Sequence, residues 1–209
     1  MPINQHYLLF GKYVLIINNM QKKEIITIAG ALGGGKSSTA DLVAKKLGYE
    51  RFSSGDFMRK LAVVMNISLN DLSTLAQTDE SIDIKIDEEV KKAGEQNKIV
   101  IDSRLAFHWI PESFKVYLDL PPEIAKQRIL NNLKENALRA QSENSQTSEE
   151  IEAKINSRLA SEKKRYKDLY GIANHTDKNN FDLVIDTNKN NLDQVVDLVV
   201  SEYQKWLTS

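Results

Sequence analysis

The residues best suited to chemistry lie in one short glycine-rich segment. Residues 30–37 read GALGGGKS, which fits the pattern G-x-x-x-x-G-K-S/T, and an apolar run precedes them at 25–29. Such a loop between a strand and a helix arranges backbone N–H groups around a phosphate, at the positive end of the helix dipole. We therefore expect this loop to bind the phosphates of a nucleoside triphosphate, through Gly30, Gly33, Gly34, Gly35, Lys36, Ser37 and Ser38.

Two side chains of this loop have chemical roles in that interpretation. Lys36 is expected to reach the β- and γ-phosphates as a catalytic cation, and the Ser37 hydroxyl to hold Mg²⁺. The competing interpretation is a glycine-rich turn that binds nothing. An amphipathic helix pattern after the loop, with Leu42, Val43 and Leu47, favours the phosphate-binding loop.

A second group of polar residues follows the apolar run at 99–101. Asp102 ends this run and Arg104 comes two residues later. Ligands of open parallel sheets bind at the carboxyl ends of the strands. Asp102 is therefore a candidate to hold a water on Mg²⁺, and Arg104 to meet an anion. The alternative is a helix cap beside a solvated arginine.

The segment 52–60, FSSGDFMRK, suggests a further anion site. Ser54 is a suitable N-cap for a helix, and Arg59 falls near the first turns of that helix. A helix N-terminus together with an arginine binds anions. An ordinary cap beside a surface arginine fits the segment equally well.

Three charged residues share one face of the helix expected over 148–170. Arg158, Glu162 and Arg165 are spaced at i, i+4 and i+7. The spacing alone favours a solvated face with glutamate–arginine pairs. The functional alternative is a mobile lid that brings the arginines onto a transferring phosphoryl group.

Composition excludes several classes of function. The 209 residues include 28 basic and 29 acidic ones, and the net charge is −1, so no overall attraction to nucleic acid or an anionic membrane is expected. The absence of cysteine excludes disulfides, zinc-thiolate sites and cysteine nucleophiles. The longest apolar stretch, 7–17, is interrupted by Lys12 and is too short to span a bilayer. We expect a cytoplasmic monomer with small-molecule partners.

Alternating element patterns predict an α/β fold, a five-stranded parallel sheet with helices on both faces. Strands are expected near 24–29, 49–53, 98–102, 115–120 and 183–187, and helices over 36–47, 56–66, 69–76, 80–96, 122–138, 148–170 and 191–206. A polar segment at 139–148 precedes the long helix, where Thr147 and Glu150 suit a capping box.

Residues 1–22 do not fit this pattern, because the first strand of such a fold normally lies close to the N-terminus. They form either an extra hairpin at 7–18 around Gly11 or an upstream extension whose true start is Met20. Neither alternative is given a catalytic role.

Taken together, the segments resemble the nucleoside monophosphate kinases, and most of all the archaeal-type cytidylate kinases. The resemblance runs from about Glu24 to Val200. SSGDFMRKLA together with SEKKRYKDLYGI is far more specific than the phosphate loop. The other matching segments are IITIAGALGGGKSSTADLVAKKLG, TDESIDIKIDEEV, RLA, YLDLPPEIAKQRI and FDLVIDT.

This resemblance implies a P-loop three-layer fold and a kinase activity. It implies an N-terminal extension at 1–22 and a kinase domain at 23–209, with a helical acceptor-binding region at 54–97 and a lid at 139–170. The implied reaction transfers a phosphoryl group from ATP, with Mg²⁺, to CMP or dCMP. The alternatives are a kinase for another nucleoside monophosphate or a small metabolite, and a P-loop ATPase or switch.

The resemblance also assigns roles to individual residues. It places Ser54, Gly55 and Arg59 on the acceptor monophosphate, and Arg104 facing the acceptor nucleotide. Arg128, which by its position alone either stacks on a base or lies on the surface, matches the arginine that packs on the adenine of ATP. The remaining assignments are Arg158, Glu162 and Arg165 in the lid, with both arginines catalytic, and Asp83 against the acceptor nucleoside. Asp102-Ser103 departs from the Glu-Gly common in the family.

Overall fold

The computed structural model describes residues 5–10, 13–18, 22–135 and 148–209. Five strands form a parallel sheet in the order β4-β5-β3-β6-β7. They are β3 (Ile25–Gly30), β4 (Glu50–Ser53), β5 (Ile99–Asp102), β6 (Phe114–Asp119) and β7 (Leu183–Asp186). The predicted five-stranded parallel sheet is confirmed.

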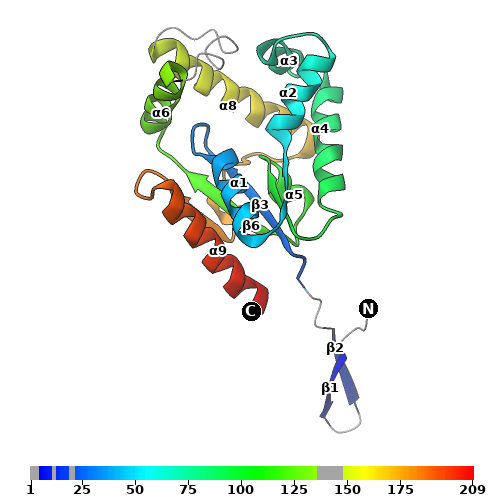
Figure 1. Ribbon diagram of the computed structural model, residues 1–209. Coiled ribbons are helices and arrows are strands. Elements are labelled where there is room, and N and C mark those ends of the chain that lie inside the picture. Colours follow the sequence, from blue (N-terminus) through cyan, green and yellow to red (C-terminus); the bar gives the residue numbers. More distant parts are fainter. Residues whose placement is uncertain (1–4, 11–12, 19–21, 136–147) are drawn as a thin grey trace.

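Helices cover both faces of this sheet, as predicted (Figure 1). On one face, β3, β5 and β6 share an apolar core with α1 (Lys36–Leu47) and α9 (Leu192–Thr208). On the other face, β3 and β5 pack against α4 (Glu80–Ala93) and α5 (Ala106–Trp109). Because both faces are covered, the central strands read as nearly continuous apolar runs.

The remaining helices lie above the carboxyl edge of the sheet. Helices α2 (Ser54–Val64), α3 (Leu69–Leu75) and α4 share a small apolar core of their own. Helix α8 (Ser148–Tyr170) crosses between α6 (Pro122–Glu135) and this group (Figure 1). Its Tyr166 is buried against Leu105 and Phe107, so the C-terminal half of α8 is anchored to the loop after β5.

Most predicted elements agree with the structure to within a few residues. The short α5 and the 3-10 turn η1 (Lys178–Asn180) were not predicted, because such lengths carry no periodic pattern. Residues 139–147, including Thr147 of the expected capping box, lie outside the described residues, and α8 begins at Ser148.

The N-terminal segment contains a separate two-stranded antiparallel sheet. Strand β1 (Gln5–Phe10) pairs with β2 (Tyr13–Asn18), and Phe10 lies opposite Tyr13. This arrangement corresponds to the hairpin alternative. Gly11 and Met20 lie outside the described residues. In the described part of the chain, no helix is long and apolar enough to cross a membrane.

The turn between β3 and α1 depends on two glycines. Gly30 has φ 146°, and a Cβ there would lie 2.4 Å from the carbonyl oxygen of Leu118 on β6. Gly35 has φ 82° and is the N-cap of α1, where no side chain caps the helix. The first amides of α1 are thus left available to an anion.

Replacing Gly30 is expected to destabilise the fold strongly. In Gly30→Ala the new methyl group meets the backbone of β6, which cannot move aside, so the free energy of unfolding should fall by about 3 kcal/mol. The measurement is urea unfolding followed by circular dichroism.

The matched control is Gly48→Ala, which also has a positive φ but open space around it. It should cost only about 1 kcal/mol, the strain of the left-handed backbone. Equal losses in the two variants would show that close approach to β6 is not the constraint at Gly30.

Candidate active site

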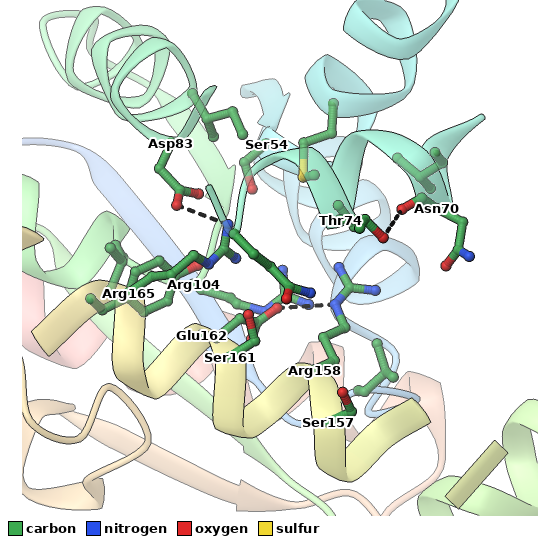
Figure 2. A pocket seen from close by; sticks show the side chains of 18 of the residues that line it. Ser54, Asn70, Thr74, Asp83, Arg104, Ser157, Arg158, Ser161, Glu162 and Arg165 are labelled. Carbon is green, nitrogen blue, oxygen red and sulfur yellow. Dashed lines mark hydrogen bonds and ion pairs between the residues drawn. The ribbon is translucent and has the colours of Figure 1, made fainter. Parts of the chain in front are cut away.

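A pocket of about 560 Å³ lies where the loops after β3 and β5 meet α2, α3, α4 and α8. Figure 2 shows side chains from these helices pointing into it. The predicted site residues that line it are Gly33, Ser54, Asp83, Arg104, Arg158, Glu162 and Arg165. The predicted residues outside its lining are Gly30, Gly34, Gly35, Lys36, Ser37, Ser38, Gly55, Arg59, Asp102 and Arg128.

Glu162 is the central charge of this pocket. Arg104 Nε lies 2.8 Å from its Oε2, and Arg158 Nε donates to its Oε1 at 3.0 Å. Burial alone would raise the pKa of Glu162, but the two arginines more than offset this and hold the pKa below its ordinary value. Because the side chain of Glu162 is only 6 % exposed, the solvated-face interpretation of this stripe is wrong.

Arg165 connects α8 to the acceptor-side helices. Its Nη1 lies 2.9 Å from Asp83 Oδ2 on α4 and donates to the carbonyl oxygen of Ala76 at 3.1 Å (Figure 2). Burial raises the pKa of Asp83 to about 6, and the nearby Arg165 acts against the rise. Arg165 and Asp83, which the sequence predicted on two different helices, thus form an ion pair.

The phosphate loop keeps its lysine close to its own backbone. Lys36 Nζ donates to the carbonyl oxygens of Gly30 at 2.9 Å and Ala31 at 2.8 Å. Removal from water, together with the positive charge of Arg104, lowers the pKa of Lys36 to about 8. Lys36 is therefore a cation at neutral pH that loses its proton more easily than an exposed lysine.

Asp102 lies beside this loop. The Ser37 hydroxyl donates to Asp102 Oδ2 at 2.8 Å, and Asp102 is 5 % exposed. Among the described residues, no group of three or more His, Cys, Asp or Glu side chains is arranged to hold a metal. A hydroxyl and a single carboxylate nevertheless suit Mg²⁺, which takes its other ligands from water and nucleotide phosphates.

The predicted cap of α2 is wrong by one residue. Ser53 is the N-cap and accepts from the backbone N–H of Asp56, while Ser54 lies inside the helix and donates to the Asp102 carbonyl oxygen at 3.3 Å. Arg59 is half-exposed and paired with Asp56. In this conformation the anion site expected at Ser54 and Arg59 is therefore occupied by the protein's own carboxylate.

Sequence reasoning missed an arginine below this helix. Arg51 lies on β4, where its Nη1 donates to Asp56 Oδ2 at 3.0 Å and its Nη2 lies 3.6 Å from Asp102 Oδ2. No periodic pattern distinguishes Arg51 from a surface arginine. Its place inside a short strand, directly before the polar segment 52–60, was the signal that could have identified it as a site residue.

His175 was also missed. Its Nε2 lies 3.8 Å from Glu162 Oε2, and its ring packs edge-on against Tyr166 at 5.0 Å between centroids. Burial lowers the pKa of His175 to about 4, so the ring is neutral at pH 7. It therefore adds packing, and not a third positive charge, around Glu162.

Arg128 lies at a different place from the pocket. It extends from α6 to the loop after β7, where its Nη2 donates to the Thr187 carbonyl oxygen at 2.5 Å and its Nη1 to the Thr187 hydroxyl at 3.4 Å. Gly33 is close to this helix, because a Cβ there would lie 3.2 Å from the Ala125 carbonyl oxygen. The phosphate loop therefore packs against the helix that carries Arg128.

Comparison with known proteins identifies similar chains. Residues 26–156 match the AAA domain family. The chain is 34 % identical over 163 residues to the cytidylate kinase of Methanocella arvoryzae, covering 78 % of this chain and 86 % of that one. It is 32 % identical over 167 residues to the cytidylate kinase of Methanococcus maripaludis, covering 78 % and 87 %.

Solved structures share the fold. The shikimate kinase of Bacteroides thetaiotaomicron has a TM-score of 0.59 at 13 % identity, covering 88 % of this chain and 98 % of that one. The shikimate kinase of Acinetobacter baumannii, solved with shikimate, has a TM-score of 0.55 at 16 % identity, covering 90 % and 95 %. At such low identity the likeness supports the P-loop kinase fold alone.

Removing the charge of Glu162 is expected to destabilise the protein. In Glu162→Gln, Arg104 and Arg158 lose the carboxylate that compensates both, so the free energy of unfolding at pH 7 should fall by about 3 kcal/mol. Urea unfolding measures this loss. Lys167→Ala, an exposed change on the same helix, is the control and should have little effect.

The difference between wild type and Glu162→Gln should depend on pH. The folded-state pKa of Glu162 is lowered, so its contribution is present above its ordinary pKa and is lost as the pH falls through the lowered value. The two unfolding free energies should therefore converge in acid. A constant difference down to the acid transition would contradict the ion-pair explanation.

Proposed function

We propose that this chain, which belongs to the cytidylate kinase family and is a nucleoside monophosphate kinase, transfers the γ-phosphoryl group of ATP to CMP or dCMP. The observation that carries the proposal is the pocket that joins the phosphate loop, through Leu32 and Gly33, to Arg104 and Arg158. This is the arrangement that two adjacent phosphates need. The choice of CMP is supported by the cytidylate kinases among the relatives.

The donor nucleotide would lie along the phosphate loop. The uncapped N-terminus of α1 and the Lys36 ammonium would bind its β- and γ-phosphates. Arg128 would pack on the adenine, beside Thr187. Ser37 and Asp102 would hold Mg²⁺, directly or through water, and the ion would neutralise phosphate charge when bound.

The acceptor would lie in the pocket with its phosphate toward the loop. Arg104 and Arg158 share the single negative charge of Glu162, so together the three groups carry one net positive charge. Ser54 and Gly55 would border the same phosphate. Arg59 would join them only by exchanging Asp56 for the substrate, since the two are paired.

Transfer itself needs positioning and charge neutralisation more than proton transfer. The acceptor phosphate is already a nucleophile, so no strong base is required. Lys36, Arg158 and Arg165 would surround the charge that spreads over the transferring group. Movement of the part of α8 that precedes the anchored Tyr166 would bring Arg158 closer and exclude water, which otherwise hydrolyses ATP.

A coupled assay of ADP release over a panel of nucleoside monophosphates tests the proposal. The purified protein, ATP and Mg²⁺ should give the highest kcat/KM with CMP or dCMP. Faster turnover with UMP, AMP or GMP would contradict the cytidylate assignment, and turnover with water alone would contradict acceptor binding in the pocket.

Substitutions of Arg104 and Arg158, the two arginines paired with Glu162, should affect different kinetic constants. Arg104→Ala should raise the KM for CMP by roughly 10- to 100-fold with little change in the KM for ATP, because a charge-assisted contact contributes about 1.5–3 kcal/mol. Arg158→Ala should mainly lower kcat, since its partial exposure and place on α8 suit a contact completed during transfer. Steady-state kinetics with Lys167→Ala as control measures both; an increase in the ATP KM alone would reject these roles.

ATP binding should weaken as the pH rises above about 8. The phosphates bind the protonated form of Lys36, which predominates below its pKa and is lost above it. Calorimetric titration of ATP from pH 6 to 10 measures the effect without requiring turnover.

Two variants of Lys36 test different properties. Lys36→Arg, which stays charged, should remove the pH dependence of ATP binding. Lys36→Ala should lower kcat on the order of 10²–10³-fold. An unchanged pH dependence in Lys36→Arg would show that another group titrates.

A further inference from the structure

Helix α4 presents a second carboxylate to the pocket, one turn after Asp83. Asp87 lines the pocket and is 6 % exposed. Asp83 forms an ion pair with Arg165, whereas Asp87 forms none among the described residues. The Oδ2 atoms of both are buried without a hydrogen-bond partner. A carboxylate so deeply buried is costly unless a donor satisfies it.

Two hydrogen-bond donors lie beside Asp87. Burial raises the pKa of Asp87, and the Tyr170 hydroxyl and Trp109 indole act against the rise. Both donor atoms are buried, and neither completes a hydrogen bond. Neither residue lines the pocket while Asp87 does, so the two donors lie on the interior side of the carboxyl, and its pocket side is left to a ligand.

The charges of the pocket decide which part of a nucleotide meets Asp87. A phosphate is attracted to Arg104 and Arg158 and repelled by the carboxylates of α4. The base is uncharged and carries N–H groups. Ile86 and Tyr166, beside the carboxylates, offer apolar and aromatic surface for a base. The base is therefore expected to lie against the side of the pocket that α4 forms.

We propose that Asp87 reads the base of the acceptor by accepting a hydrogen bond from its exocyclic amino group. The inference rests on the proposed function, since it takes the acceptor to be a nucleoside monophosphate in this pocket. In its ionised form the Asp87 carboxylate only accepts hydrogen bonds, and aspartate accepts from N4 of cytosine. Uracil has an oxygen at the same position, which would leave two buried acceptors facing each other.

The decisive variant is Asp87→Asn. Asparagine has the same size, and its amide can donate to the uracil O4. The ratio of kcat/KM for CMP to that for UMP should fall on the order of 10²–10³-fold relative to wild type. Glu88→Gln, a carboxylate-to-amide change at the exposed neighbouring position of α4, should leave the ratio unchanged. A ratio in Asp87→Asn within about threefold of wild type would overturn the inference.

A substrate analogue provides a second measurement, and its comparison with CMP in the wild-type enzyme needs no variant. The monophosphate of the pyrimidin-2-one riboside lacks only the exocyclic amino group of CMP. Wild type should use it as poorly as Asp87→Asn uses CMP, and Asp87→Asn should scarcely distinguish the two. If wild type uses the analogue as well as CMP, Asp87 does not read the amino group.

These outcomes separate the inference from the proposed function. If the wild-type enzyme prefers AMP to CMP, the cytidylate assignment fails. Asp87 is then tested by the ratio of AMP to IMP, a pair that also differs by an amino group and an oxygen. A fall of that ratio in Asp87→Asn supports the amino-group contact, and an unchanged ratio overturns it.

Discussion

The position of α8 over the sheet depends on one buried carboxylate. Glu162 holds Arg104, from the loop after β5, and Arg158, from its own helix. Removing three charges from water costs more than any one of these contacts returns, so the arrangement is stable only when complete. Because Tyr166 is buried one turn later against the same loop, polar and apolar contacts fix α8 at the same point.

A second constraint comes from the parallel strands. Their register places Ser53 and Ile28 on either side of Asp102, so β4 and β5 end at the same level of the sheet and β3 continues two residues further, to Gly30. The buried carboxyl of Asp102 then receives hydrogen bonds from Ser37 at 2.8 Å and Ser53 at 3.3 Å. Satisfying this one group joins the phosphate loop to the start of α2.

The pocket between these elements carries an uneven distribution of charge. Arg104 and Arg158, held by Glu162, are close enough to the phosphate loop to lower the pKa of Lys36, and Asp83 and Asp87 belong to α4. Helix α4 shares an apolar core with α2 and α3, so the three helices pack as one unit beside the pocket. A nucleotide has the complementary distribution, an anionic phosphate joined to an uncharged base.

The sequence by itself determined the features that depend on local pattern. The phosphate loop follows from glycine and lysine spacing, and the five strands and the long helices follow from periodicity and caps. It also identified Asp102 and Arg104, because a parallel sheet brings strand ends to one edge. The roles of these residues, and of Arg59 and Arg128, remain proposals.

Only the tertiary structure decided what the charged residues contact. The spacing of Arg158 and Glu162 is the same in a solvated stripe and in a buried cluster, and burial depends on Arg104 and Tyr166 from outside that pattern. The N-cap of α2 is Ser53 and not the predicted Ser54. The two adjacent serines have the same hydroxyl, so only the path of the chain after β4 decides which of them caps the helix. Asp87 shared its helix with several other acidic residues, and only the packing of α4 made it a buried one.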